Sequence, residues 1–299
     1  MSSMVMQPLR GEIRLNEPLA RHTSWRVGGP ARRFYRPADA EDLSTFLSLL
    51  DPDEPLLWLG LGNNLLIADQ GFAGTVIQTQ GCLTGLERHG KTGIWAESGT
   101  ACAKLARCAA RLDLIGVEFL AGIPGTMGGA LAMNAGAWGG ETWTQVRRVR
   151  TIDRTGAIRG RGREDFTPGY REVTGPEGEW FLDVALELVP GDGAAGQARI
   201  RELLDRRAAT QPIGLPSCGS VFRNPPGDHA ARLIESLGLK GYRMGGAQVS
   251  EKHANFIINT GTATATEIAG LIDYVRDAVE QRAGIRLIPE VRRVNGEGS

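Results

Sequence analysis

The stretch Phe119-Leu-Ala-Gly-Ile-Pro-Gly-Thr-Met-Gly-Gly-Ala130, followed by Met133-Asn-Ala-Gly-Ala-Trp-Gly-Gly-Glu141, places small residues where larger apolar side chains would normally fill a core. Glycine adopts positive φ readily and lets backbone N–H groups converge on an anionic or flat aromatic ligand. A shorter segment of the same character, Gly60-Leu-Gly-Asn-Asn-Leu-Leu66, could present N–H groups to a phosphate. These two glycine-rich loops indicate that the backbone approaches one extended ligand closely, although a run of tight turns would have the same composition.

A dinucleotide would fit two such loops. Neither loop matches the Gly-x-Gly-x-x-Gly pattern that leads from a strand directly into a helix within a βαβ unit. The Rossmann fingerprint is therefore absent, and a cofactor would be held in some other way.

The composition favours a globular protein without a nucleic-acid or membrane partner. With 299 residues and zero formal net charge, the chain is long enough for two or three domains and lacks the basic charge of a nucleic-acid binder. It contains no run of about 18 apolar residues, and residues 1–10 lack the apolar core of a signal peptide. The cysteines and histidines show no metal-ligand spacing. We expect a soluble, cytoplasmic protein with no bound metal.

The first two-thirds of the chain is predicted to combine helices and strands, and its second region, from residue 93, is predicted to be α+β with mainly antiparallel strands. Periodicity and capping residues predict helices over residues 39–50, capped by Asp39, and 100–112, capped by Thr100. Strands are expected over residues 56–62, 75–79, 93–97 and 180–188, with a hairpin over 147–158 that turns at Asp153-Arg-Thr-Gly156.

From about residue 196 the pattern changes to longer helices, which predicts a separate α/β unit. Helices are expected over residues 199–209, 229–237 and 264–283, and short strands over 256–258 and 285–288. Thr264 and Glu267 form a capping box, while Gly238 and Gly284 follow the last two helices. The predicted domains are residues 1–80, 81–195 and 196–299.

Three clusters outside the glycine-rich loops carry candidate reacting groups, namely Arg171, Ser220 and Glu290. Arg171 offers a planar, always-charged fork to a carboxylate or a developing enolate. Ser220 lies in a glycine-flanked turn from which its hydroxyl could reach a ligand. The alternatives are a surface ion pair for Arg171 or for Glu290, which has Arg292 and Arg293 close by, and a backbone hydrogen bond for Ser220.

Seven motifs occur in one order from about residue 15 to the end of the chain. They are His22-Thr-Ser-Trp-Arg-Val-Gly-Gly-Pro-Ala31, Gly60-Leu-Gly-Asn-Asn-Leu-Leu66, Ala121-Gly-Ile-Pro-Gly-Thr-Met-Gly-Gly-Ala130 with Met133-Asn-Ala-Gly136, Tyr170-Arg171, Gly219-Ser-Val-Phe-Arg-Asn-Pro225, Lys252-His-Ala-Asn-Phe-Ile-Ile-Asn259 and Pro289-Glu-Val291. With this set the chain resembles the UDP-N-acetylenolpyruvoylglucosamine reductase family, in the branch with a short interval between Arg171 and Ser220.

The resemblance implies an α+β protein with an FAD-binding fold of the vanillyl-alcohol oxidase type in two subdomains, followed by a C-terminal α/β substrate-binding domain. It implies that NADPH reduces FAD, which then reduces UDP-N-acetylglucosamine enolpyruvate to UDP-N-acetylmuramate, a peptidoglycan precursor. The implied FAD-binding residues are Gly60, Gly62, Asn63, Asn64, Leu65, Gly122, Ile123, Pro124, Gly125, Thr126, Gly128, Gly129, Ala130, Asn134, Ala135 and Gly136.

The resemblance also assigns roles to the three candidate reacting groups. Hydride addition to the terminal enolpyruvyl carbon leaves negative charge at the adjacent carbon and its carboxylate. By similarity, Arg171 and Glu290 bind and polarise this group, and Ser220 donates the proton. The implied substrate-binding residues are Tyr170, Asn224 and His253.

Three positions depart from the family pattern. Val173 stands where the family usually has Ser or Thr, which leaves the support of Arg171 open. Thr210 stands where the family often has a Lys suited to the substrate diphosphate, and Asn63 replaces a more usual Ser. The arginines that could replace that Lys are Arg206, Arg207 and Arg223.

Two other functions stay open. One is an FAD-dependent oxidase of the same fold that acts on another alcohol or sugar. The other is a flavin-binding or UDP-sugar-binding protein without turnover. The departures from the family pattern at Val173 and Thr210 are the reason to consider this alternative.

Overall fold

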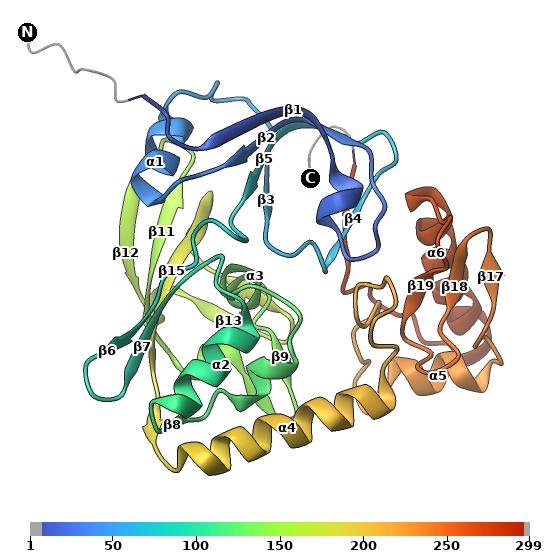
Figure 1. Cartoon of the computed structure of the whole chain (residues 1–299). Coiled ribbons are helices and arrows are strands. Elements are labelled where there is room, and N and C mark those ends of the chain that lie inside the picture. Colours follow the sequence, from blue (N-terminus) through green and yellow to red (C-terminus); the bar gives the residue numbers. More distant parts are fainter. Residues whose placement is uncertain (1–7, 296–299) are drawn as a thin grey trace, which may run out of the picture. The chain divides into compact units, whose positions relative to one another are not determined.

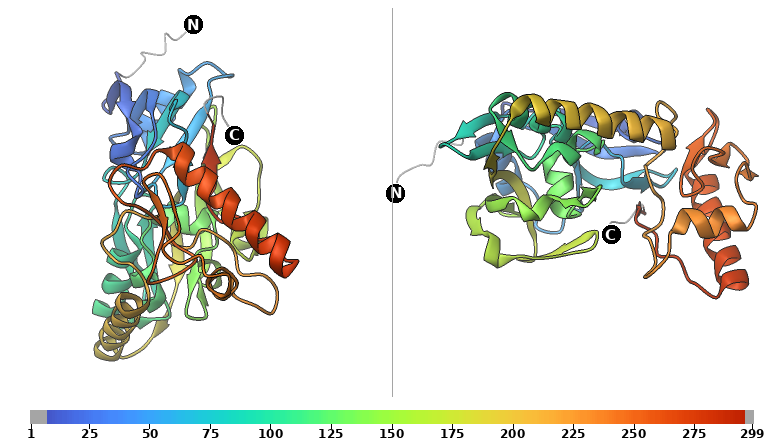
Figure 2. Two further views of the ribbon diagram at one scale, coloured as in Figure 1. Left: turned by 90° about the vertical axis from the view of Figure 1, so that its right-hand side faces the viewer. Right: turned by 90° about the horizontal axis from the view of Figure 1, so that it is seen from below.

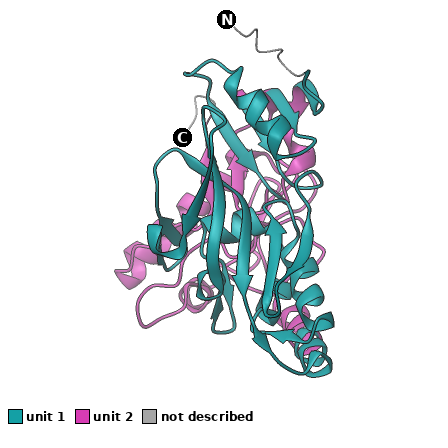
Figure 3. Ribbon diagram, turned by 90° about the vertical axis from the view of Figure 1, so that its left-hand side faces the viewer, with its two compact units in different colours: residues 1–15, 33–60, 75–200 teal, residues 16–32, 61–74, 201–299 magenta. Residues whose placement is uncertain are grey.

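The computed structural model describes residues 8–295, which form two compact units (Figure 3). Unit 1 comprises residues 8–15, 33–60 and 75–200, and unit 2 comprises residues 16–32, 61–74 and 201–295. The chain passes between the units several times, so each unit combines segments that are distant in sequence. Residues 1–7, part of the segment interpreted above as lacking a signal peptide, lie outside the described residues.

Unit 1 is built on a five-stranded antiparallel sheet with the strand order β12-β11-β15-β7-β6 (Figure 1). Its strands are β6 (Leu86–His89), β7 (Gly93–Glu97), β11 (Val146–Asp153), β12 (Ile158–Gly162) and β15 (Glu179–Glu187). The structure therefore confirms the predicted hairpin and the strands predicted over residues 93–97 and 180–188. The short helix α3 (Met127–Ala132) packs against β15 and β7.

Helix α1 (Ala40–Ser48) begins as predicted, because Asp39 accepts a hydrogen bond from the Asp42 N–H at 2.9 Å. Phe46 on its buried face stacks on Tyr35 of β2 (Pro30–Arg36), with 3.6 Å between the ring centroids. Asp42 is itself buried and accepts a hydrogen bond from the Tyr35 hydroxyl at 2.5 Å. Burial, and then this hydrogen bond, raise the pKa of Tyr35. Asp42 therefore adds negative charge to the first turn of α1 and also links this helix to β2.

Helix α2 (Cys102–Arg111) corresponds to the helix predicted over residues 100–112, but the predicted cap is wrong. Its N-cap residue is Ala101, and the Thr100 hydroxyl instead donates to the Gly85 carbonyl at 2.9 Å. The Cys102 N–H donates to the Gly125 carbonyl at 2.9 Å. Tertiary contacts thus satisfy the start of this helix, and the local sequence does not reveal them.

A second sheet has the strand order β1-β2-β5-β3, in which β3 and β5 are parallel. These two strands overlap the short strands predicted over residues 56–62 and 75–79. The bounds are β1 (Glu12–Pro18), β3 (Leu56–Leu59) and β5 (Phe72–Gln78). The remaining short elements of unit 1 are β8 (Leu114–Ile115), η2 (Glu118–Gly122), β9 (Gly136–Ala137), β10 (Gly140–Glu141), η3 (Thr142–Thr144), η4 (Arg163–Asp165), β13 (Thr167–Gly169), β14 (Glu172–Thr174) and β16 (Val189–Pro190). Helix α4 (Gly193–Thr210) begins in unit 1 and ends in unit 2.

Unit 2 contains a three-stranded antiparallel sheet, β17-β18-β19, and the helices α5 and α6, together with the end of α4. Its elements are η1 (Leu19–His22), β4 (Leu65–Ile67), α5 (Ala230–Ser236), β17 (Arg243–Met244), β18 (Ala247–Val249), β19 (Ile257–Asn259), α6 (Ala265–Ala283) and β20 (Arg292–Val294). Helix α6, the long red helix in Figure 2, begins with the predicted Thr264 and Glu267 capping box and ends at Gly284, whose φ is 67°. Both helix ends were readable from the sequence because their capping groups are local.

The strand predicted over residues 285–288 is wrong. The strand in this region is β20, which starts at Arg292 and runs parallel to β4. Before it, Pro289 forms only a single-residue bridge with Phe222. Proline has no N–H to contribute to a ladder, so an extended apolar stretch that ends in proline need not pair along its length.

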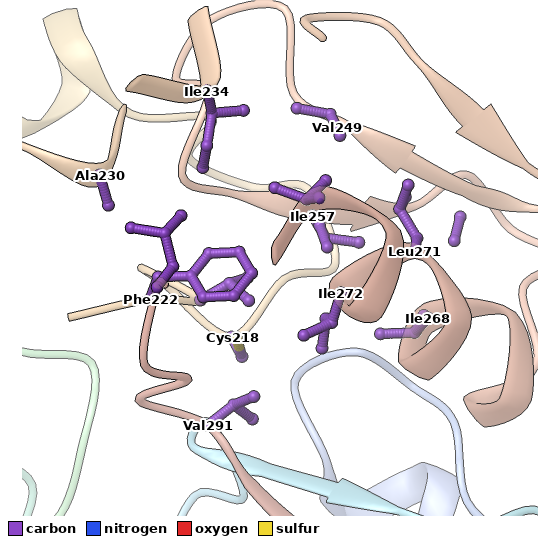
Figure 4. Close-up of a cluster of buried hydrophobic side chains, with 14 of the residues drawn as sticks. Cys218, Phe222, Ala230, Ile234, Val249, Ile257, Ile268, Leu271, Ile272 and Val291 are labelled. Carbon is purple, nitrogen blue, oxygen red and sulfur yellow. The ribbon is translucent and has the colours of Figure 1, made fainter. Parts of the chain in front are cut away.

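The hydrophobic core of unit 2 surrounds one face of α6 (Figure 4). The predicted apolar stripe of this helix is buried throughout, at Ile268, Leu271, Ile272, Val275 and Val279. Phe222 and Val291 belong to the same cluster, so the segments that carry Ser220 and Glu290 are both anchored in it. Among the helices formed by residues 8–295, none has the length and apolar character needed to cross a membrane.

Candidate functional site

The glycines of the two loops differ in what surrounds them. An added Cβ at Gly60 would lie 2.5 Å from Thr126 Oγ1, and at Gly122 it would overlap the ring of a nearby tryptophan, so packing within unit 1 requires glycine there. At Gly125 and Gly129 the nearest atoms would lie at ordinary contact distances of 3.7 and 3.8 Å. Packing of the chain does not account for glycine at these two positions, whereas close approach of a ligand would.

Two buried hydroxyl groups lie beside these glycines. Thr126 and Ser98 are each 1% exposed, and within residues 8–295 neither hydroxyl oxygen has a hydrogen-bond partner. An unsatisfied buried hydroxyl costs about 1–3 kcal/mol, and a polar ligand group that reached these two hydroxyls would remove that cost. Sequence reasoning missed Ser98, because its only link to the loop is spatial: a Cβ at Gly128 would lie 3.0 Å from the Ser98 Cβ.

The N–H groups at the start of α3 are used within the protein. The Met127 N–H donates to the Thr100 carbonyl and the Gly128 N–H donates to the Ser98 carbonyl, both at 2.8 Å. These two groups therefore do not explain how the loop could bind a phosphate, and the two buried hydroxyls are the stronger indication of a ligand.

Asn134 ties the second glycine-rich loop to the hairpin of β13 and β14. Its Nδ2 donates to the Gly169 carbonyl at 3.0 Å and to Glu141 Oε2 at 3.1 Å, and its Oδ1 accepts from the Trp143 N–H at 3.2 Å. The residue is 2% exposed and has a positive φ of 41°. Its side chain is therefore committed to the protein, and a contact of Asn134 with a cofactor would come through the backbone.

Arg171 lies at the tip of the same hairpin with a φ of 59°, a costly conformation for a residue other than glycine. Its Nη2 donates to the Gly136 carbonyl at 2.8 Å, and its guanidinium lies 5.2 Å from the centre of the Tyr170 ring. Val173 pairs with Pro168 within the hairpin. The structure thus brings Tyr170, Arg171 and Gly136 together in unit 1, and Gly136 and Tyr170 provide support for Arg171.

In unit 2, Ser220 and Glu290 lie on neighbouring segments that are hydrogen-bonded to each other. The Glu290 N–H donates to the carbonyl of Val221, the residue after Ser220, at 2.8 Å. Gly219 precedes them with a φ of 83°, and nothing lies within 4 Å of the position that its Cβ would occupy. Backbone conformation, not crowding, therefore favours glycine there. The structure therefore pairs the segments that carry two of the three predicted reacting groups.

Residues 62–65 of the first glycine-rich loop also belong to unit 2, beside the Glu290 segment. Asn64 Nδ2 donates to the Glu290 carbonyl at 3.2 Å, and the Arg292 N–H donates to the Asn64 carbonyl at 3.0 Å. At Gly62, where φ is 62°, a Cβ would overlap the His22 carbonyl oxygen. The loop predicted to bind the cofactor is therefore joined to a predicted reacting segment within one unit.

His253 and Asn224, the implied substrate-binding residues of unit 2, both have protein partners. Burial, and then the positive charge of Lys240, lower the pKa of His253, which favours the neutral form of its ring. Its Nδ1 accepts from the Asn255 N–H at 3.3 Å, as a neutral ring can. Asn224 Oδ1 accepts from the Ala230 N–H at 3.1 Å, at the first residue of α5.

Thr210, in the last turn of α4, donates its hydroxyl to the Arg206 carbonyl at 2.9 Å and supplies no charge. Two cations lie near the same helix end. Arg207 is half-buried, and this burial lowers its pKa, while Lys252 Nζ donates to the Ala208 carbonyl at 2.6 Å. Arg207 and Lys252 therefore place positive charge near the helix end that carries Thr210.

Cys218 is a buried thiol two residues before Ser220. Burial, and then the negative charge of Glu290, hold the pKa of Cys218 well above its usual range. The thiol therefore stays protonated at neutral pH and is not a candidate nucleophile.

Comparison with known proteins first gives the class. A family model described as an FAD binding domain matches residues 31–160, the part of the chain that contains both glycine-rich loops, Ser98 and Thr126. The loops, the two buried hydroxyls and this match define the chain as a flavoprotein that binds FAD.

The particular family follows from the remaining comparisons. The model of the C-terminal domain of UDP-N-acetylenolpyruvoylglucosamine reductase matches residues 211–294. Reductases of that name from Alkalilimnicola ehrlichii and Methylococcus capsulatus are 62% and 61% identical to this chain, covering 95% and 96% of it and 95% and 94% of their own lengths. The crystal structure of UDP-N-acetylenolpyruvylglucosamine reductase from Thermus caldophilus is 33% identical, with a TM-score of 0.79 over 95% of this chain and 98% of that one. The chain belongs to the UDP-N-acetylenolpyruvoylglucosamine reductase family and is an FAD-containing oxidoreductase, which confirms the resemblance and the α+β fold class.

Proposed function

We propose that this protein reduces UDP-N-acetylglucosamine enolpyruvate to UDP-N-acetylmuramate, with NADPH as the electron donor, in the cytoplasmic synthesis of peptidoglycan precursors. The observation that carries the proposal is the hydrogen-bonded pairing of the Ser220 and Glu290 segments. It occurs in a chain that is similar, over nearly the whole length of each relative, to proteins with this enzyme's name. The expected partners are this substrate and NADPH, without nucleic acid or membrane.

FAD, when bound and reduced by NADPH, supplies a hydride to the terminal enolpyruvyl carbon. The Ser220 hydroxyl gives its proton to the adjacent carbon, so hydride and proton together saturate the double bond, and water then returns a proton to the serine. Arg171 and Glu290 bind and polarise the enolpyruvyl group, where negative charge develops. Serine is a weak acid in water, so its contribution depends on a preorganised site, in which one well-placed donor is worth about 2.7–4 kcal/mol. Tyr170, Asn224 and His253 bind the substrate.

Residues of both glycine-rich loops hold the cofactor in this proposal. They are Gly60, Gly62, Asn63, Asn64, Leu65, Gly122, Ile123, Pro124, Gly125, Thr126, Gly128, Gly129, Ala130, Asn134, Ala135 and Gly136, to which we add Ser98. The support is the uncrowded Gly125 and Gly129 and the two hydroxyls without partners among the described residues. Residues 1–80 and 81–195 form the FAD-binding subdomains, and residues 196–299 form the substrate-binding domain.

An anaerobic visible spectrum of the purified protein tests the proposal. We expect stoichiometric NADPH to bleach the flavin bands and UDP-N-acetylglucosamine enolpyruvate to restore them. Bleaching without return, combined with rapid reoxidation by oxygen, would instead support an oxidase with another substrate. Substrate binding without any bleaching would support a protein that has lost turnover, and a protein unable to bind FAD would overturn the proposal.

A further inference from the structure

The backbone that follows Ser220 is held along one edge by the segment that carries Glu290. The Glu290 N–H donates to the Val221 carbonyl at 2.8 Å, and the Arg223 N–H donates to the Ile288 carbonyl at 2.9 Å. In such a pairing, the N–H and carbonyl of the residue between, Phe222, point to the opposite edge. Because Phe222 is only 2% exposed, both groups need a partner within the protein.

A single side chain, that of Asn255, serves this opposite edge. Its Oδ1 accepts from the Phe222 N–H at 3.0 Å, and its Nδ2 donates to the Phe222 carbonyl at 2.8 Å. The backbone carbonyl of Asn255 accepts from the Val221 N–H at 2.9 Å. The amide of Asn255, 3% exposed, thus reproduces the paired donor and acceptor of a neighbouring strand.

The chemistry of this position is specific to an amide. Aspartate would offer no donor to the Phe222 carbonyl, and a smaller or apolar side chain would leave two buried backbone groups unsatisfied. Asn255 also donates its N–H to Nδ1 of His253 at 3.3 Å, so it joins an implied substrate-binding residue to the Ser220 segment.

We propose that Asn255 is a positioning residue that fixes the Ser220 hydroxyl relative to Glu290, an inference that rests on the proposed function. Asn255 acts through the backbone that follows Ser220 and does not itself take part in proton transfer. Only the step that uses the serine proton should therefore depend on it. That step is the oxidation of reduced flavin by the enolpyruvyl substrate, whereas the reduction of flavin by NADPH requires no proton from Ser220.

A double-mutant cycle on the FAD-bound protein tests this inference in a stopped-flow instrument. We expect N255A to slow reoxidation of the flavin by the enolpyruvyl substrate by about 10- to 100-fold, the scale of a misplaced reacting group. The rate of flavin reduction by NADPH should stay within about twofold of that of the unmodified protein, because this step needs no proton from Ser220. An unchanged reduction rate also shows that the flavin site of the same preparation is intact. In the S220A background, N255A should add less than a threefold loss, since the group on which it acts is already gone.

Asn259 provides the matched control. It is also a buried asparagine of unit 2, 5% exposed, with its Nδ2 donating to the Trp25 carbonyl at 2.8 Å and its Oδ1 accepting from the Gly261 N–H at 2.8 Å. N259A should lower the unfolding temperature without slowing reoxidation relative to reduction. If N255A cannot be obtained with FAD bound, N255S carries the same cycle. If neither variant binds FAD, Asn255 is a general scaffold residue and the inference is wrong.

The outcomes separate this inference from the function on which it rests. Failure of the unmodified protein to reoxidise with the enolpyruvyl substrate, or a normal rate in S220A, would overturn the proposed function or the role of Ser220. A normal reoxidation rate in N255A, or an equal loss with and without the Ser220 hydroxyl, would overturn only the positioning role of Asn255.

Discussion

The Thr126 hydroxyl leads to a prediction in which the FAD-free and FAD-bound proteins respond differently. Thr126 is 1% exposed, and its hydroxyl has no hydrogen-bond partner within residues 8–295. Thr126→Val keeps the shape of the side chain and removes the unsatisfied group. Because such a group costs about 1–3 kcal/mol, we expect the free energy of unfolding of the FAD-free protein to rise by about 1 kcal/mol, measured by urea unfolding.

FAD binding should change in the opposite sense. A hydrogen bond to a charged group contributes about 1.5–3 kcal/mol, and each 1.4 kcal/mol corresponds to a tenfold change in the dissociation constant. If the hydroxyl of Thr126 binds FAD, Thr126→Val should weaken FAD binding by about 10- to 100-fold. Titration of the FAD-free protein, followed by flavin fluorescence, measures this change.

Thr100 is the matched control, because it is fully buried in the same unit but its hydroxyl donates to the Gly85 carbonyl at 2.9 Å. Thr100→Val should lower the free energy of unfolding by about 1 kcal/mol and leave FAD affinity unchanged. Two results would refute the interpretation of Thr126 as a cofactor ligand: a loss of stability in Thr126→Val like that of Thr100→Val, or unchanged FAD binding.

Three further predictions concern stability and are measured by thermal or chemical unfolding. Gly122→Ala should lower the free energy of unfolding by about 1–3 kcal/mol, because the added methyl group overlaps an indole ring. Gly160→Ala, with no atom within 4 Å of the added Cβ, should leave this free energy unchanged or raise it slightly. Equal effects of the two substitutions would contradict the steric argument. Burial alone would raise the pKa of Asp153, but hydrogen bonds from a threonine and an arginine outweigh it and lower the pKa to about 2. The stabilisation by the Asp153 carboxylate is therefore complete above about pH 4 and is lost as the pH falls through about 2. Asp153→Asn should lower the free energy of unfolding at pH 7, and its difference from the unmodified protein should shrink as the pH falls from about 4 to about 2. A difference that does not change with pH would exclude the charge as the cause. Asp69 accepts hydrogen bonds from the first two N–H groups of α6 at 2.8 and 2.9 Å, so Asp69→Ala should cost about 0.5–2 kcal/mol, and an unchanged unfolding midpoint would show that α6 is capped without it.

The elements predicted correctly are those whose determinants are local. Asp39 caps α1 through a residue three positions later, and the Thr264 capping box and Gly284 bound α6 in the same way. The cap predicted at Thr100 is wrong because its hydroxyl bonds to a carbonyl 15 residues away, and no local pattern encodes that contact. The strand predicted over residues 285–288 is wrong because a strand also requires a partner along its length.

The candidate site shows the same division. Residue chemistry and motif order predicted Arg171, Ser220 and Glu290 as reacting groups, and the structure pairs the segments that carry the last two. Ser98 and Asn255 could not be found from the sequence, because each gains its significance from a neighbour that is distant in the chain.

The sequence by itself determined the family, the class of cofactor, the start of α1 and both ends of α6, because glycine-rich loops, capping residues and ordered motifs are properties of residue type and spacing. Only the tertiary structure decided which polar groups are satisfied. It committed the Asn134 amide to the hairpin, left the Thr126 hydroxyl without a partner among the described residues, and matched the Asn255 amide to the Phe222 backbone. Hydrogen bonding of a buried group depends on atoms brought within about 3 Å by the whole fold, and spacing along the chain does not specify that distance.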